Sequence, residues 1–131
     1  MTVPRLGCGA AILDTAGRML LARRLTEPEA GCYGLLGGKI EPGEATRDAI
    51  LREIEEEIGV RLELQGFLCA VDLILPGGIH WVSVVERARI AAGTPEIREP
   101  EKLTDLGWFA RDALPQPLTQ AAIAAVKALE G

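Results

Sequence analysis

The chain has 131 residues, of which 48% are apolar and 25% are charged, a balance that excludes a disordered protein and fits one globular domain over residues 1–131. Fourteen Lys and Arg against nineteen Asp and Glu give a formal net charge of −5, which excludes a protein that holds long nucleic acids by neutralising their phosphates. The apolar runs are too short to span a membrane and the N-terminus lacks the features of a signal peptide, so we expect a soluble, cytoplasmic protein.

Two short apolar segments begin the chain and lie on either side of a turn. Leu6 to Leu13 is followed by Asp14-Thr15-Ala16-Gly17, and the second segment lies within Arg18 to Arg24. This pattern predicts a β-hairpin. From Leu25 to Gly43 the chain carries seven Gly and Pro residues, which predict a long loop with room for one short strand. Loops of this length usually serve a function.

The segment from Glu44 to Ile58 contains no Gly or Pro and is rich in Ala, Leu, Arg and Glu, and Gly59 follows it. This composition predicts a helix that ends at the glycine. Val60 to Leu75 and Ile79 to Ala91 are both rich in β-branched residues, and a Pro-Gly-Gly turn joins them. We therefore expect a second hairpin after the helix.

The last third of the chain predicts a loop, a strand and a helix. Thr94 to Lys102 is polar and contains two prolines, Leu103 to Phe109 is typical of a short strand, and Leu118 to Leu129 is an Ala-rich amphipathic segment. Strands interleaved with two helices in this order predict an α/β fold, in which helices cover a mixed sheet on both faces.

One residue of the second hairpin breaks the strand pattern. Strict alternation places Glu86 on the apolar face, together with Val82, Val84, Ala88 and Ile90. A β-bulge or the edge of the sheet would explain this position. The alternative is a carboxylate that points into a pocket.

Three glutamates of the predicted helix share one side. Glu53, Glu56 and Glu57 are spaced i, i+3, i+4, so they lie within an arc of roughly 100°. Like charges at these spacings each cost about 0.2–0.5 kcal/mol, and the negative end of the helix dipole adds to the cost. The cluster is therefore either a solvated acidic face or a site that binds a cation.

A glycine-rich loop precedes this helix. Adjacent Gly37 and Gly38 allow a ligand to approach the backbone closely, and Lys39 follows them. Together with the acidic helix, the loop offers hard oxygen ligands beside backbone donors, which suits a divalent cation carrying a polyphosphate. With one histidine, His80, and no cysteine cluster, the composition favours Mg²⁺ or Mn²⁺ over Zn²⁺.

The loop and the helix together resemble the Nudix box at every position. The matching residues are Gly38, then five residues, Glu44, then seven residues, and the run Arg52-Glu53-Ile54-Glu55-Glu56-Glu57-Ile58-Gly59-Val60. The resemblance implies a Nudix-type α/β/α sandwich. It also implies Mg²⁺-dependent hydrolysis, with Mn²⁺ as a substitute, of a nucleoside diphosphate linked to another group.

The resemblance also implies roles for single residues of the box. Glu53, Glu56 and Glu57 would bind the metal, with the Gly38 carbonyl as a further ligand. Arg52 would hold the glutamates in position through ion pairs.

The catalytic base differs between branches of the Nudix family. The resemblance leaves it open between Glu53 and a glutamate of the later loop, for which we expect Glu101 ahead of Glu99. Lys39 and Arg23 are candidate phosphate contacts, although Arg23 could equally be a surface charge. Because only five residues are aromatic, few side chains are available to form a wall for the base: Tyr33, Phe67, Trp81, Trp108, Phe109 and the aliphatic Leu118.

Further segments resemble a branch of nucleoside-triphosphate diphosphatases, among them His80-Trp81-Val82 and Gly107-Trp108-Phe109. We therefore expect hydrolysis of a normal, oxidised or modified nucleoside triphosphate to the monophosphate and pyrophosphate. Hydrolysis of ADP-ribose, another nucleotide sugar or a dinucleoside polyphosphate is the alternative within the enzyme class, and a non-catalytic nucleotide-sensing module is the alternative outside it. The expected partner is a small nucleotide, with no long nucleic acid and no membrane, and the family resemblance suggests a homodimer.

Overall fold

The computed structural model describes residues 3–131, which form two β-sheets and two helices. The strands and helices follow one another in this order: β1 (Arg5–Ile12), β2 (Met19–Arg24), β3 (Tyr33–Gly34), β4 (Leu36–Lys39), α1 (Thr46–Ile58), β5 (Arg61–Leu75), β6 (Ile79–Ala92), β7 (Leu103–Phe109) and α2 (Gln120–Glu130). Within residues 3–131, neither helix is long and apolar enough to cross a membrane.

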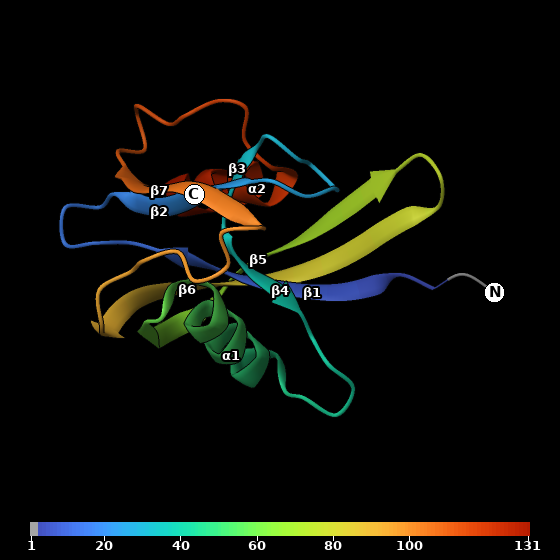
Figure 1. Cartoon of the computed structure of the whole chain (residues 1–131), viewed down its shortest axis with the longest axis horizontal. Coiled ribbons are helices and arrows are strands. Elements are labelled where there is room, and N and C mark those ends of the chain that lie inside the picture. Colours follow the sequence, from blue (N-terminus) through green and yellow to red (C-terminus); the bar gives the residue numbers. More distant parts are fainter. Residues whose placement is uncertain (1–2) are drawn as a thin grey trace.

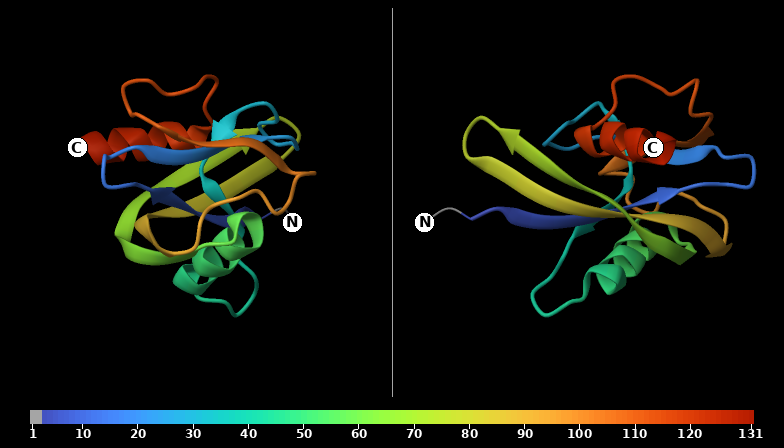
Figure 2. Two further views of the ribbon diagram at one scale, coloured as in Figure 1. Left: turned by 60° about the vertical axis from the view of Figure 1, so that its left-hand side comes forward. Right: turned by 180° about the vertical axis from the view of Figure 1, so that it is seen from behind.

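A four-stranded mixed sheet lies at the centre of the molecule. Its strand order is β4-β1-β6-β5, with β1 and β6 parallel and the other pairs antiparallel. A second, antiparallel sheet has the order β3-β2-β7. Helix α1 covers one side of the molecule, whereas α2 lies on the other side beside the second sheet (Figures 1 and 2). The predicted α/β/α sandwich with a mixed central sheet is therefore confirmed.

Strand β1 is apolar along most of its length because both of its faces are buried. Cys8, Ala10 and Ile12 pack in a core cluster with the isoleucines of α1, whereas Ala11 packs in a second cluster with Ala122 of α2. A strand covered on both faces shows a continuous apolar run rather than an alternating one. The β4–loop–α1 unit is attached to this strand, since β4 pairs with it in antiparallel register.

The predicted hairpin between the first two strands is wrong. The turn forms, since the Asp14 carboxylate accepts hydrogen bonds from the N–H groups of Ala16 and Arg18, at 3.0 and 2.8 Å. However, β1 and β2 enter different sheets, and only an isolated bridge joins Leu13 to Met19. Local sequence specifies a turn, but the partner of the outgoing strand depends on segments far along the chain.

Other predicted boundaries need smaller corrections. Helix α1 begins at Thr46 rather than Glu44, because the Glu44 side chain instead accepts hydrogen bonds from Glu41 and Arg52. The long loop contains two short strands, β3 and β4, one in each sheet. Helix α2 begins at Gln120 rather than Leu118, since Thr119 is its N-cap and accepts a hydrogen bond from the N–H of Ala122.

The bulge that would explain Glu86 is present on the neighbouring strand. The β5–β6 register shifts between Leu64 and Gly66, and the N–H of Gly66 donates to the Glu86 carboxylate at 3.2 Å. Arg47 of α1 pairs with the same carboxylate at 3.1 Å and also donates to the carbonyl of Leu64. Glu86 is 5% exposed, and its ion pair with the more exposed Arg47 joins α1 to the bulge.

Candidate functional site

The glycine loop and the acidic helix lie directly against each other. The N–H of Gly37 donates a 2.7 Å hydrogen bond to the Glu57 carboxylate. A Cβ atom added at Gly38 would overlap the Glu53 carboxylate, so only glycine leaves room for this side chain. Strand β4 therefore presents two bare backbone positions to two carboxylates of α1.

Arg52 connects the acidic residues on the outer side of α1. Its guanidinium donates to both carboxylate oxygens of Glu44, at 2.7 and 2.9 Å, and to Glu53 at 2.9 Å. It also lies 3.4 Å from Glu56 and donates to the carbonyl of Lys39 at 3.0 Å. Hydrogen bonds from Arg52 and from the Glu41 N–H lower the pKa of Glu44 to about 2. Arg52 thus joins the loop to two of the three predicted metal ligands.

Glu57 is the carboxylate that most requires a positive partner. It is 8% exposed, and this burial raises its pKa to about 8, against an ordinary value of 4.5. The negative charges of Glu53 and Glu99 raise the pKa further, whereas the Gly37 hydrogen bond and the charge of Arg24 act in the opposite direction. At neutral pH this buried acid must hold a proton or a cation.

The donor set of these carboxylates suits a hard cation. Within residues 3–131, no three Asp, Glu, His or Cys side chains converge closely enough to enclose a metal ion, and Arg52 contacts Glu53 and Glu56 instead. The available ligands are nevertheless all oxygens, from Glu53, Glu56, Glu57 and the bare backbone at Gly38. This set fits Mg²⁺ or Mn²⁺ better than Zn²⁺.

A cleft of about 370 Å³ extends from the glycine loop. One end of the cleft is lined by the glycine loop, Gly37 to Lys39. The part over the sheet is lined by Trp81 and Ser83 of β6. Residues of the loop after β2 and of the beginning of α2 also line it. The cleft meets the acidic helix at Gly37 and Gly38, the two residues that lie against the Glu57 and Glu53 carboxylates.

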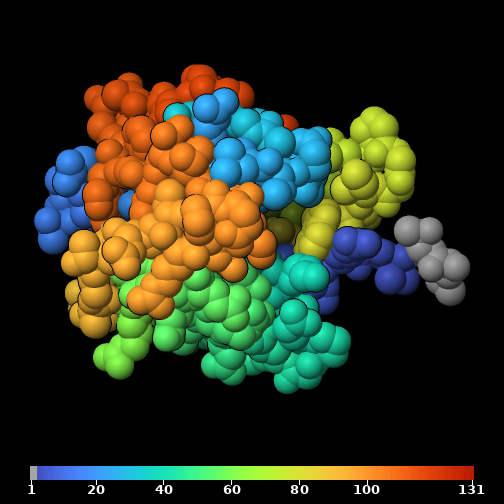
Figure 3. All heavy atoms as spheres, in the orientation of Figure 1, coloured from blue at the N-terminus to red at the C-terminus, as the bar shows by residue number. Residues whose placement is uncertain are grey.

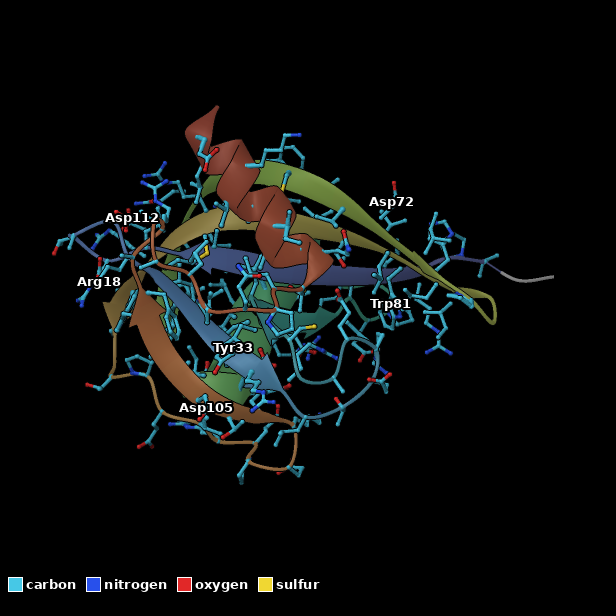
Figure 4. All side chains as sticks on the ribbon, turned by 90° about the horizontal axis from the view of Figure 1, so that it is seen from above. Arg18, Tyr33, Asp72, Trp81, Asp105 and Asp112 are labelled. Atoms are coloured by element: carbon cyan, nitrogen blue, oxygen red, sulfur yellow. The ribbon has the colours of Figure 1, made fainter. Side chains whose placement is uncertain are left out.

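Of the four predicted substrate contacts, Lys39 lines the cleft and the other three lie elsewhere. Arg23 is about half exposed and lies 4.0 Å from Asp105. Tyr33 packs edge-on against Phe109 with 5.8 Å between ring centroids, and Leu118 belongs to the packed core around α2. Figure 4 shows Tyr33 beside β2, whereas Trp81 lies toward the outer part of the β5–β6 hairpin.

Arg24, which is not among the predicted substrate contacts, lines the cleft in place of Arg23. Its Nε donates to the carbonyl of Pro28 at 2.8 Å, and its charge lowers the pKa of Glu57. Successive side chains of a strand point to opposite faces, so the exposed Arg23 and the half-buried Arg24 cannot both face the site. The alternation of side chains along the strand was the signal that could have separated Arg24 from Arg23.

The loop between β6 and β7 brings a further carboxylate to α1. The N–H of Arg98 donates to the carbonyl of Glu57 at 2.9 Å, and the next side chain, Glu99, is 25% exposed. Glu101, two residues further along the loop, is exposed. Glu99 is thus the less exposed of the two loop glutamates, and the choice of Glu101 ahead of Glu99 stays a prediction.

The family model described as NUDIX domain matches residues 3–129. A crystal structure of a MutT NUDIX hydrolase from Burkholderia pseudomallei is 49% identical to this chain, with a TM-score of 0.93, and the match covers 97% of this chain and 98% of the other.

Two curated relatives match less of their own length. An NAD-capped RNA hydrolase, NudC, from Stutzerimonas stutzeri (strain A1501) is 32% identical over 112 residues, which is 86% of this chain but 39% of the relative. A CTP pyrophosphohydrolase from Escherichia coli (strain K12) is 44% identical over 52 residues, 39% of this chain and 38% of that enzyme. The chain thus spans about two fifths of the length of these relatives.

Proposed function

This chain belongs to the NUDIX domain family, and we propose that it is a Mg²⁺-dependent pyrophosphohydrolase that converts a nucleoside triphosphate to the monophosphate and pyrophosphate. The observation that carries the proposal is the buried Glu57 carboxylate against the Gly37 N–H, beside Glu53, at the end of a cleft that Lys39 and Arg24 line. Buried acids and cationic side chains together suit a metal-bound polyphosphate.

We propose a division of roles along this cleft. Mg²⁺, held by Glu53, Glu56, Glu57 and the Gly38 carbonyl, would supply charge neutralisation of the polyphosphate and a more acidic water. Lys39 and Arg24 would bind phosphate oxygens from the cleft side. Arg52 would hold Glu53 and Glu56 in orientation through its hydrogen bonds. At the far end, Trp81 offers an aromatic face to the nucleobase, with the Arg5 guanidinium 5.7 Å from its ring centroid.

Two carboxylates are candidates for the base that accepts the proton from water: Glu53 of α1 and Glu99 of the loop. Rates of the Glu53→Gln and Glu99→Gln variants across pH, with Glu101→Gln as the exposed control, separate them. The variant that lacks the base should turn over about 100-fold more slowly than the wild type or worse, because general base catalysis contributes that much. If Glu101→Gln alone shows this loss, the assignment from burial is wrong.

The first test is product analysis with and without Mg²⁺. The panel contains the common and oxidised nucleoside triphosphates, including CTP, together with ADP-ribose, a dinucleoside polyphosphate and a short NAD-capped RNA. We expect metal-dependent release of monophosphate and pyrophosphate from triphosphates. If only ADP-ribose, the dinucleotide or the capped RNA is hydrolysed, the substrate belongs to that class and not to the nucleoside triphosphates. Binding without turnover of any compound would indicate a sensing module.

We further propose that the protein acts in the cytoplasm as a homodimer. Three large apolar side chains of the mixed sheet are more than half exposed: Leu6, Phe67 and Ile74, at 56%, 69% and 69%. Exposed apolar area on one sheet supports an interaction surface. Light scattering at micromolar concentration should give twice the chain mass, and a monomer mass would contradict the proposal.

A further inference from the structure

We propose that Arg98 is a positioning residue, whose guanidinium lies on the C-terminal end of α1 and holds the 94–102 segment so that Glu99 faces Glu57. The kinetic part of this inference rests on the proposed hydrolase function, whereas the structural part does not. The contacts that carry it lie at the end of α1, outside the cleft.

The end of α1 has an unusual charge distribution. Its last turn contains no basic residue, although Glu55, Glu56 and Glu57 lie there. The negative end of a helix dipole normally favours cations, so each of these glutamates is electrostatically unfavourable in this place. A positive group from another part of the chain would relieve this repulsion.

Arg98 supplies that positive group. A Cβ atom added at Gly59 would overlap the Arg98 guanidinium, so the guanidinium lies directly over the glycine that ends α1. Gly59 has a φ of 72°, and its N–H donates to the carbonyl of Glu55 at 3.0 Å. Glycine is therefore required here both for its backbone conformation and for the space that Arg98 occupies.

The backbone of the same segment is bonded to the helix end. The N–H of Arg98 donates to the carbonyl of Glu57 at 2.9 Å, and the N–H of Glu96 donates to the carbonyl of Ile58 at 3.1 Å. Carbonyls at a helix end need partners from outside the helix. The orange spheres of this segment lie directly on the green spheres of α1 (Figure 3).

Glu99 is held between these contacts and the start of β7. Its carbonyl accepts hydrogen bonds from the N–H groups of Lys102 and Leu103, at 2.9 and 3.1 Å. On its other side, the neighbouring Arg98 is fixed to α1. Since Glu99 lies between two anchors, loss of the Arg98 guanidinium should allow its carboxylate to move relative to Glu57. The hydrogen bond from the Arg98 N–H to the Glu57 carbonyl places the adjacent Glu99 next to this end of the helix.

A double-mutant cycle distinguishes positioning from simple helix stabilisation. The variants are Arg98→Ala, Glu99→Gln and the double variant, with Arg61→Ala as the control, because Arg61 is an exposed arginine two residues after Gly59. We expect Arg98→Ala to lower kcat roughly tenfold at nearly constant KM, and the double variant to be no slower than Glu99→Gln alone. The inference would be overturned if the losses of the two single variants multiplied in the double variant, or if Arg98→Ala kept the wild-type kcat.

Hydrogen exchange provides a readout that does not need turnover. In Arg98→Ala, the amides of Glu96, residue 98 and Lys102 should exchange at least several-fold faster than in the wild type, while the amide of Gly59 keeps its protection. Faster exchange confined to the last turn of α1, or no change at all, would contradict a positioning role. If the wild type hydrolyses nothing, the proposed function fails while this measurement still decides the role of Arg98. Arg98→Lys, which keeps the charge, replaces Arg98→Ala if that variant does not fold.

Discussion

Two adjacent arginines at the end of β2 show how much a single residue position decides. Arg24 lines the cleft and is held by the Pro28 carbonyl, whereas Arg23 lies outside it near Asp105. A charge-assisted hydrogen bond to a phosphate is worth about 1.5–3 kcal/mol. The two residues have the same chemistry, so each is a matched control for the other.

We therefore predict that Arg24→Ala lowers kcat/KM by roughly 10- to 100-fold, because it removes a phosphate contact of that strength. Arg23→Ala should remain within about twofold of the wild type, since an exposed charge contributes little. Steady-state kinetics with the best nucleotide of the panel measures both. Equal losses of kcat/KM in the two variants would show that the phosphates do not bind in the cleft.

Glu57 makes the stability of the metal-free protein depend on pH. Its pKa in the folded protein, about 8, lies above its ordinary value of 4.5, so the folded state binds the proton more tightly than the unfolded state does. The stabilisation from this group is complete below the lower value and is lost as the pH rises toward the higher one.

Urea unfolding in EDTA at pH 5, 6.5 and 8 should therefore show the wild type losing stability relative to Glu57→Gln as the pH rises. The amide of glutamine does not ionise, so the difference between the two proteins isolates this one carboxyl. Parallel pH dependences for the two proteins would mean that Glu57 titrates normally in the fold.

At the level of elements, helix α1 is connected to the mixed sheet by an ion pair to a buried carboxylate as well as by its isoleucines. Glu86 of β6 is 5% exposed and has Arg47 of α1 and the Gly66 N–H as partners. Glu86 is buried whereas the Arg47 side chain is 61% exposed, so removing Arg47 leaves a buried carboxylate with one backbone donor. This contact therefore bears on where the acidic helix lies.

Arg47→Ala should destabilise the protein by about 1–3 kcal/mol, since the Glu86 carboxylate keeps only its backbone donor. The double variant Arg47→Ala with Glu86→Gln should recover part of that loss, because the neutral side chain can still accept from Gly66. Chemical denaturation of the three proteins tests this cycle. A double variant that is less stable than both single variants would contradict the assignment.

Helix α1 and the segments around it also show how far sequence patterns reach. Its composition predicts the helix, and Gly59 predicts its end, because helix propensity and the left-handed cap are local properties. Its first residues are mispredicted because Glu44 forms contacts with Arg52 and Glu41 instead of continuing the helix. The first hairpin fails for a related reason, since the partners of β1 and β2 lie far along the chain.

At the scale of the whole molecule, the excess of negative charge and the buried acids predict that a divalent cation stabilises the fold. The chain has a formal net charge of −5, and among residues 3–131 no cationic side chain is bonded to the buried Glu57. A ligand that binds only the folded state stabilises it by mass action, by about 2.7 kcal/mol at one hundred times its Kd.

We predict that saturating Mg²⁺ or Mn²⁺ raises the Tm of the metal-free protein by about 5 °C or more at pH 7.5. NaCl of equal ionic strength is the control, because general screening would act through both salts. Glu57→Gln should lose most of the metal effect. An equal rise of the Tm with NaCl would mean that the effect is general screening. An undiminished rise in Glu57→Gln would mean that the cation binds away from Glu57.

Residue types at short, regular spacings were sufficient to predict the family resemblance, the acidic helix, the glycine loop and the all-oxygen ligand chemistry. The separation of β1 and β2 into two sheets, and the position of Arg24 rather than Arg23 in the cleft, became visible only in the folded chain. The tertiary structure also placed the Arg98 guanidinium over Gly59. These features depend on contacts between residues distant in sequence, whose partners a local pattern does not specify.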